Sequence, residues 1–177
     1  TQKIDGRWRT PGHESKGEAP TRSYLSQFTQ EKSIIEPIVK LVKHHLKPAL
    51  LYQASQKDSV SDSAIRRLTL KVPIQDLLIL GRADHFGRNN QNKLNDQYPA
   101  GEWLEKRIKA LNIDKKPPQP LLKGRHLIKK GIKPGVHMGH LLKQAFDAQL
   151  DGDFTDLNGA MEWFESNNKT RHKKTLK

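Results

Sequence analysis

The helical character of the chain is clearest in residues 33–46, SIIEPIVKLVKHHL. Ser33 and Glu36 form a capping-box pattern at its start, and Pro37 follows directly. Apolar residues then recur every three or four positions, which places them on one face of a helix: Ile34, Ile35, Ile38, Leu41, Val42 and Leu46. The pattern predicts an amphipathic helix that ends before Pro48.

The same periodicity occurs on both sides of this stretch. Further helices are predicted at about 14–27 (with Pro20 in its first turns or splitting it), from the cap Ser61 to Val72, from Ile74 to Ala83 and from Trp103 to Leu111. Others are predicted around Leu127, from Leu141 to Leu150 with its end at Asp151-Gly152, and from Leu157 to Phe164 with Thr155 or Asp156 as cap. The helix at 74–83 is apolar nearly all round, as a central core helix would be. Residues 1–12 are polar and turn-rich and predict an irregular lead-in. No convincing strand pattern occurs, so we predict an all-α fold.

Composition excludes several classes of protein. The 177 residues contain no cysteine, which excludes disulfide scaffolds, thiolate zinc sites and thiol nucleophiles and leaves His, Asp and Glu as metal ligands. No run approaches the roughly 20 apolar residues of a membrane-spanning helix. We therefore expect a cytoplasmic protein with no membrane partner. The chain begins at Thr1 without a signal-peptide pattern, and we expect it to be a fragment of a longer protein.

The charge is strongly positive and unevenly distributed. Lys and Arg number 32 against 19 Asp and Glu, giving +13. Two cationic groups lie in the last third: Lys115, Lys116, Lys123, Arg125, Lys129, Lys130 and Lys133, then Lys169, Arg171, Lys173, Lys174 and Lys177. This surplus favours a nucleic-acid partner, the alternative being a solvated basic surface. The proline-rich basic segment 115–120 is a candidate linker.

Two adjacent histidines, His44 and His45, end the helix predicted at 33–46. At about 100° per residue, His45 projects with Ile34 and Leu41, whereas His44 points toward lysines. We therefore expect His45 to face the interior and His44 to face water. An inward histidine is more often a core residue than a ligand, so both alternatives stay open for His45.

Asp84 and His13 complete a candidate metal site. Asp84 lies in the predicted all-round apolar helix, where a carboxylate needs a metal or a cation to offset its desolvation. An i,i+4 ion pair with Arg88 is the alternative explanation. Two imidazoles and a carboxylate suit a hydrolytic divalent metal, so we predict His13, His45 and Asp84 as its ligands.

Several segments together carry a family resemblance over about residues 12–163. Gly12-His13-Glu14, Leu41-Val42-Lys43-His44-His45 and Arg82-Ala83-Asp84-His85-Phe86-Gly87-Arg88 resemble the later motifs of an HD-type metal-dependent phosphohydrolase domain. Tyr98-Pro99-Ala100-Gly101-Glu102-Trp103-Leu104 and the long run from Leu121 through Gly135 to Gly152 resemble the C-terminal half of bacterial CCA-adding tRNA nucleotidyltransferases and related poly(A) polymerases.

The resemblance implies a partial HD-type helical domain at 1–114, the linker 115–120, and a helical tail at 121–177 that binds tRNA. The parent enzyme would add CMP and AMP from CTP and ATP to tRNA 3′ ends with Mg²⁺. The first His-Asp dyad of the HD domain is absent from these residues, as are the Gly-Ser motif and paired Asp residues of the nucleotidyl-transfer centre. We therefore expect that this portion does not transfer nucleotides by itself and that metal binding at the HD site is weak.

The expected contacts to RNA are phosphate contacts. They are assigned to Arg82, Arg88, Lys123, Arg125, Lys129, Lys130 and Lys133, helped by backbone amides of the glycine-rich turn at 131–135. The alternative is that the glycines in this run serve only to end a short helix and form a turn, and that the cations are solvated. Trp103 and Trp163 are predicted to be core residues and not base-stacking platforms.

Two other functions remain open at this stage. One is an HD phosphohydrolase that uses Ni²⁺, Mn²⁺ or Mg²⁺ to hydrolyse phosphomonoesters or 2′,3′-cyclic phosphodiesters. The other is an RNA-binding module with no activity. The residues do not indicate the oligomeric state.

Overall fold

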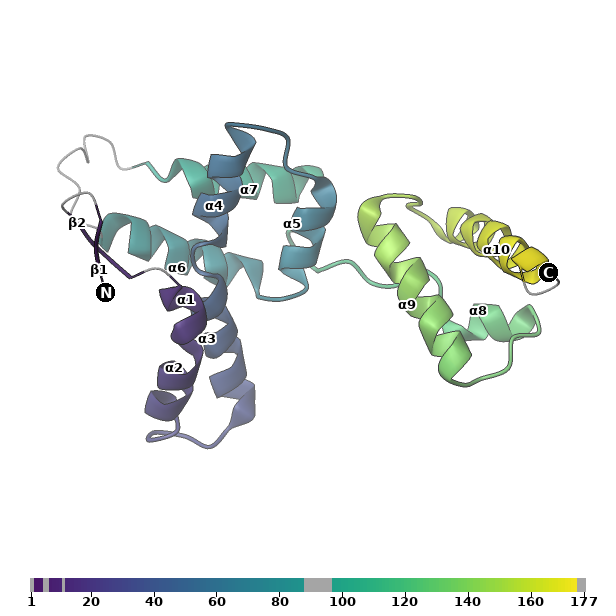
Figure 1. Ribbon diagram of the computed structural model, residues 1–177, viewed down its shortest axis with the longest axis horizontal. Helices are drawn as coiled ribbons and strands as arrows, with labels where there is room; N and C mark the ends of the chain where they lie inside the picture. Colours follow the sequence, from purple (N-terminus) through teal and green to yellow (C-terminus); the bar gives the residue numbers. More distant parts are fainter. Residues whose placement is uncertain (1, 5–6, 11, 88–96, 175–177) are drawn as a thin grey trace. The chain divides into compact units, whose positions relative to one another are not determined.

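The computed structural model describes residues 2–4, 7–10, 12–87 and 97–174, and these are mostly helical (Figure 1). The predicted all-α class is confirmed. No helix in these ranges has the length and apolar content that crossing a bilayer requires. The chain forms two compact units, residues 1–60 with 68–116 and residues 61–67 with 117–177.

The lead-in differs from the prediction. Strands β1 (Gln2–Ile4) and β2 (Arg7–Arg9) pair antiparallel, with Lys3 opposite Trp8. Three-residue strands are too short to show a period, but the Asp-Gly dipeptide between them is typical of two-residue hairpin turns. Asp5 and Gly6 themselves lie outside the described residues.

The first unit begins with a helix broken in two. The predicted helix at 14–27 is split into α1 (His13–Lys16) and α2 (Glu18–Leu25) at Gly17, and not at Pro20. Pro20 occupies the third position of α2, where a missing N–H costs no helical hydrogen bond. A Cβ on Gly17 would lie 3.0 Å from Val42 Cγ1, so glycine allows the α1–α2 junction to approach the next helix closely.

Helix α3 spans Lys32–His44 and α4 spans Lys47–Ser55. The N-cap of α3 is Glu31, which makes no side-chain cap, so the predicted capping box at Ser33 is wrong. The Glu31 carbonyl accepts the N–H groups of Ile34 and Ile35, which starts the helix two residues early.

Helix α6 (Ile74–Gly87) is not buried all round. It buries Ile74, Leu77 and Gly81 on the face that contacts α3, α4 and α7 (Pro99–Ala110), whereas Ile79 is 69% exposed. The helix is therefore one-sided, and the prediction of a central core helix is wrong because hydropathy alone does not show how many neighbours a helix has.

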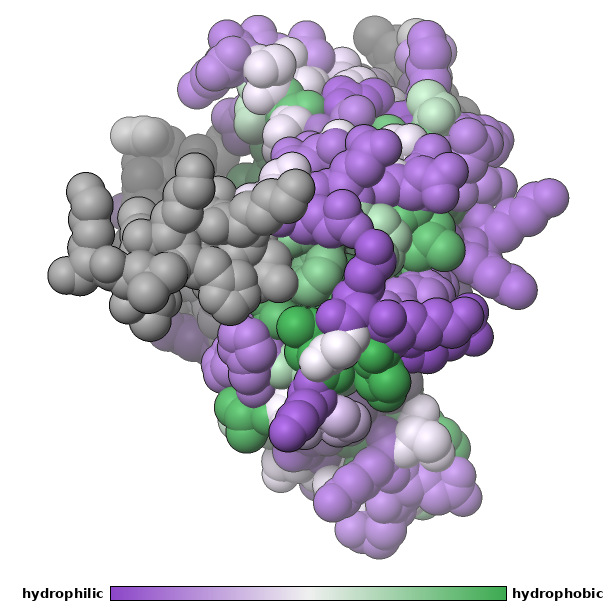
Figure 2. Space-filling view, turned by 90° about the vertical axis from the view of Figure 1, so that its right-hand side faces the viewer, coloured by the Kyte–Doolittle hydropathy of each residue, from purple (hydrophilic) through white to green (hydrophobic). Residues whose placement is uncertain are grey.

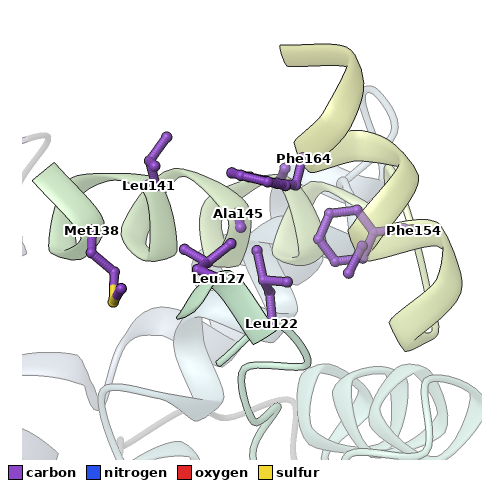
Figure 3. Close-up of a cluster of buried hydrophobic side chains, with 9 residues drawn as sticks. Leu122, Leu127, Met138, Leu141, Ala145, Phe154 and Phe164 are labelled. Atoms are coloured by element: carbon purple, nitrogen blue, oxygen red, sulfur yellow. The ribbon is translucent and has the colours of Figure 1, made fainter. Parts of the chain in front are cut away.

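The second unit contains α8 (Gly124–Lys129), α9 (Val136–Asp151) and α10 (Leu157–Lys174), with most of α5 (Asp62–Thr69). Its core consists of apolar side chains from these helices and their connections: Leu122, Leu127, Met138, Leu141, Ala145, Ala148, Phe154, Ala160 and Phe164. Leu122 and Leu127 point toward α9 (Figure 3).

The end of α9 and the starts of α5 and α10 agree with the sequence prediction, whereas α9 begins at Val136 and not at Leu141, and α10 continues past Phe164 to Lys174. Gly152 ends α9 at φ 95°, a left-handed conformation that favours glycine. Asp156 Oδ1 accepts the Gly159 N–H at 2.8 Å, so Asp156 caps α10. Ser61 Oγ likewise accepts the Ala64 N–H at the start of α5.

One grouping could not be predicted from hydropathy. Residues 61–67 belong to the second unit, because Arg66 donates to the Leu150 carbonyl at 3.0 Å and Arg67 makes a bidentate pair with Asp151. The other division, between residues 116 and 117, lies within the segment 115–120.

Candidate functional site

Two of the three predicted metal ligands meet in the first unit. His13 is the first residue of α1 and His45 follows the last residue of α3, so two helix ends bring them together. Their Nε2 atoms are 3.2 Å apart. The sequence separation is 32 residues, and only the fold brings the two rings into contact.

The other ring nitrogens set the protonation pattern. His13 Nδ1 contacts the Thr10 carbonyl at 2.8 Å and His45 Nδ1 contacts the Val42 carbonyl at 2.6 Å. A carbonyl only accepts, so each Nδ1 carries a hydrogen, and the lone pair of each neutral ring lies on Nε2. Two lone pairs facing each other repel unless a proton or a metal cation lies between them.

The pair fits a metal ion as two nitrogen ligands. With metal–nitrogen bonds of about 2.0–2.1 Å, a nitrogen separation of this size corresponds to a bite angle of about 100°, between the octahedral and tetrahedral values. Nδ1–H bonds to backbone carbonyls are also the usual way in which metal-binding imidazoles are oriented. Within the described ranges, however, no three His, Asp or Glu side chains are assembled for one metal ion.

Asp84, the third predicted ligand, is not grouped with the two histidines around one metal position. It lines a cavity of about 250 Å³ together with His45, while His13 does not. Asp84 has at least one interaction partner within the protein. Arg88, its proposed ion-pair partner, lies outside the described residues.

The predicted orientation of the two neighbouring histidines is wrong in part. Both are half-buried, and His44 Nδ1 is buried without a hydrogen-bond partner. Burial, followed by the positive charges of Lys71, Lys47 and Lys43, lowers the pKa of His44. His45 keeps helical backbone angles (φ −57°, ψ −29°), so it does project away from His44, and the prediction failed because a helical wheel does not show which neighbouring elements cover each side chain.

The second unit carries the basic residues assigned to RNA. Lys123, Arg125, Lys129, Lys130 and Lys133 are all exposed. In the part of the chain that the structure describes, Lys130 is the only one of the five in an ion pair, with Glu165 at 2.6 Å. Figure 2 shows hydrophilic side chains over most of the face in view, with apolar atoms in separate patches.

The turn between α8 and α9 has a backbone that only glycine adopts readily. Gly131 has φ 81° and Gly135 has φ 156°, and a Cβ would meet no atom within 4 Å at either. The requirement for glycine is therefore conformational. Gly135 is the N-cap of α9, which has no side-chain cap and no acidic residue in its first turn. Exposed Lys133 precedes this end, whose N–H groups attract anions.

His126 shapes the start of α8. Its Nδ1 accepts the Lys123 N–H at 3.1 Å, and Arg125 Nε lies 3.2 Å from its Nε2. Partial burial, then the charges of Arg125, Lys123 and Lys129, lowers the pKa of His126. The neutral ring therefore caps α8 through Nδ1, and its Nε2, which then carries the hydrogen, cannot also accept from Arg125.

The remaining predicted RNA contacts are not in this unit. Arg82 is exposed on α6 in the first unit, and its guanidinium carbon lies 5.4 Å from the centre of the Phe86 ring. Arg88 is outside the described residues. Arg82 and the five basic residues of the second unit therefore belong to different units of the chain.

Sequence reasoning did not single out the cavity beside His45. Its walls include Tyr52, His85 and Tyr98, which come from α4, α6 and the start of α7. Gly81 and Gly101 could have indicated close packing at this place, because the ring of Tyr98 lies where a Cβ on either residue would be.

Comparisons with known protein families, curated proteins and solved structures give no match for this chain.

Proposed function

We propose that the chain is the RNA-binding portion of a tRNA nucleotidyltransferase of the CCA-adding or poly(A) polymerase type. In this proposal the second unit holds tRNA phosphates, and a catalytic head outside these residues transfers CMP and AMP from CTP and ATP with Mg²⁺. The absence of cysteine suits a cytoplasmic enzyme of tRNA processing.

The observation that carries the proposal is the exposed basic turn of the second unit. Lys129 ends α8, and Lys133 shortly precedes Gly135, the N-cap of α9, which has no side-chain cap. Both lysines are exposed and without ion pairs in the described structure. Cations and backbone N–H groups that converge on a turn bind phosphate without reading bases. Recognition by shape and charge suits a protein that must accept every tRNA.

The test is the salt dependence of tRNA binding by the full chain. Each neutralised phosphate contributes about 0.7–0.9 to the slope of log K against log salt concentration. Replacing Lys129, Lys130 and Lys133 with Ala should lower the slope by about two. Fluorescence anisotropy with a labelled tRNA measures it.

A matched control removes the same charge elsewhere. Lys32, Lys40 and Lys57 are exposed in the first unit, and replacing them with Ala also removes three positive charges. This variant should keep most of the wild-type slope. Equal losses in the two variants would indicate attraction by net charge alone and would remove the phosphate site from the α8–α9 turn.

The second candidate function is a metal-dependent phosphohydrolase, and the His13–His45 pair favours it. A divalent cation bound there would polarise a phosphoryl oxygen of a phosphomonoester or a 2′,3′-cyclic phosphodiester. Assaying the chain with 2′,3′-cyclic AMP and Mn²⁺ or Ni²⁺ tests it. Hydrolysis that is lost in His45→Ala would support this function.

A further inference from the structure

The first unit contains the cavity of about 250 Å³ that Asp84 and His45 line. Its lining includes aromatic side chains, Tyr52 and Tyr98 among them, and the small residues Ala49, Pro99 and Ala100. A space of this size with several aromatic rings in its lining suits a planar ligand of one or two rings.

The ring of Tyr98 is held in place by two glycines. A Cβ on Gly81 of α6 would overlap the Tyr98 hydroxyl, and a Cβ on Gly101 of α7 would overlap the Tyr98 ring carbons. The same ring contacts His85, with the ring centres 5.2 Å apart. Tyr98 is only 7% exposed, so its position does not depend on a ligand.

The ring of Tyr52, which also lines the cavity, is held by packing as well. Tyr52 packs against Trp103 with ring centres 6.2 Å apart, and the Arg107 guanidinium lies 5.6 Å from the Trp103 ring centre. Arg107 also donates to the Val60 carbonyl at 3.1 Å. These contacts fix the rings before a ligand arrives, which lowers the entropic cost of binding.

The polar groups in the wall narrow the choice of ligand. Asp84 and His85 both line the cavity, so a pure hydrocarbon would desolvate them without replacing their hydrogen bonds. A carboxylate has about four lone-pair positions, so Asp84 can accept from a ligand in addition to its partners within the protein. The matching ligand is flat, aromatic and carries an N–H donor.

We propose that this cavity binds a nucleobase with an exocyclic amino group, stacked against the aromatic walls and donating to the Asp84 carboxylate. Adenine, cytosine and guanine carry that donor. Uracil presents carbonyl oxygens on either side of its N–H, and these repel a carboxylate. The proposal concerns the first unit alone and does not depend on phosphate binding by the second unit or on a metal ion.

The first experiment titrates the full chain with adenosine, purine riboside and uridine by isothermal calorimetry. A ligand of this size at ordinary efficiency predicts a dissociation constant on the order of 0.1 mM for adenosine. Purine riboside lacks the amino group and should bind roughly tenfold more weakly, as should uridine. Asp84→Asn should reduce the preference for adenosine over purine riboside roughly threefold.

A blocking variant and its control separate the cavity from the rest of the surface. Ala49 is exposed at the cavity wall, and Ala49→Trp should fill the space and abolish adenosine binding. Ala54 is exposed on the same helix and does not line the cavity, so Ala54→Trp should bind adenosine as the wild type does. Circular dichroism checks that both variants remain folded.

A last arm identifies the source of the base. If the base comes from an RNA end, the trinucleotide CCA should bind at least tenfold more tightly than adenosine, and Ala49→Trp should lose that affinity. If the base comes from a free nucleoside, adenosine should bind as tightly as CCA. Either result supports the cavity as a base site. Absence of saturable adenosine binding, or binding that Ala49→Trp leaves unchanged, overturns the proposal.

Discussion

The two units place their polar chemistry differently. In the first unit, His13, His45 and Asp84 come from separate elements and lie at a helix junction or in a cavity wall. In the second unit, the core is apolar and the basic residues point into solvent around one turn. Replacing one residue should therefore abolish most ligand binding at a convergent site. On a dispersed cationic surface, each replaced residue should lower the affinity for RNA by a small step.

The largest expected effect concerns the core beneath the basic turn. Leu127 is fully buried and Ile128, its neighbour on α8, is 53% exposed. Leu127→Ala should lower the free energy of unfolding by about 2–5 kcal/mol because it removes buried methyl groups and leaves a cavity. Ile128→Ala should cost less than about 1 kcal/mol. Urea denaturation measures both, and similar losses would contradict the burial of α8.

Metal binding by single variants tests whether His13 and His45 act together as one site in the first unit. His45→Ala should weaken Ni²⁺ or Mn²⁺ binding by roughly 10- to 100-fold, because one of two facing nitrogen ligands is lost. His13→Ala should have the same effect. His44→Ala should leave binding within about threefold, since its ring does not contact the pair; calorimetry with the metal alone measures all three. If His44→Ala matched His45→Ala, the pair would not be the metal site.

Replacing a glycine with alanine should lower the free energy of unfolding in the first unit and raise it in the second. Gly101→Ala places a Cβ inside the Tyr98 ring and should destabilise the protein by about 1–3 kcal/mol. Gly139 lies in the first turn of α9 with nothing near its Cβ position, so Gly139→Ala should stabilise by up to about 1 kcal/mol. Thermal unfolding compares the two. A neutral Gly101→Ala would show that Tyr98 is not held as described.

The smallest expected effect is a pH dependence from His44. Its pKa is lowered in the folded state, so between that value and the unfolded value of about 6.5 the unfolded chain binds more protons. The contribution of His44 is therefore fully present above about pH 6.5 and is lost as pH falls below it. His44→Gln should flatten the dependence of the unfolding free energy on pH between about 7.5 and 5. An unchanged dependence would contradict the burial of this ring.

Much of the fold could be predicted because local signals agree with it. The Ser61 cap and the Gly152 end of α9 are visible in the sequence, and the structure confirms both. Where the prediction was wrong, the deciding contact is distant in sequence. Glu36, which was expected in a capping box with Ser33, pairs with Arg22 of α2, and Arg67 joins residues 61–67 to the second unit through Asp151.

For the candidate sites too, some features could be predicted from the sequence, and others depend on tertiary packing. Residue type and order along the chain predicted His13, His45 and Asp84 as ligands of one metal ion, and the structure brings together His13 and His45. The cavity could not be predicted, since Tyr52, His85 and Tyr98 come together only through packing of α4, α6 and α7. Exposure of the basic turn followed from its hydrophilic sequence, but the pairing of Lys130 with Glu165 did not.

The most direct test of RNA binding by the second unit is an amide NMR titration of the full chain with an acceptor-stem RNA hairpin. We predict that the largest chemical-shift changes occur at residues 123–139, around α8, the glycine turn and the start of α9. Changes confined to the first unit, or spread evenly over both units, would contradict it.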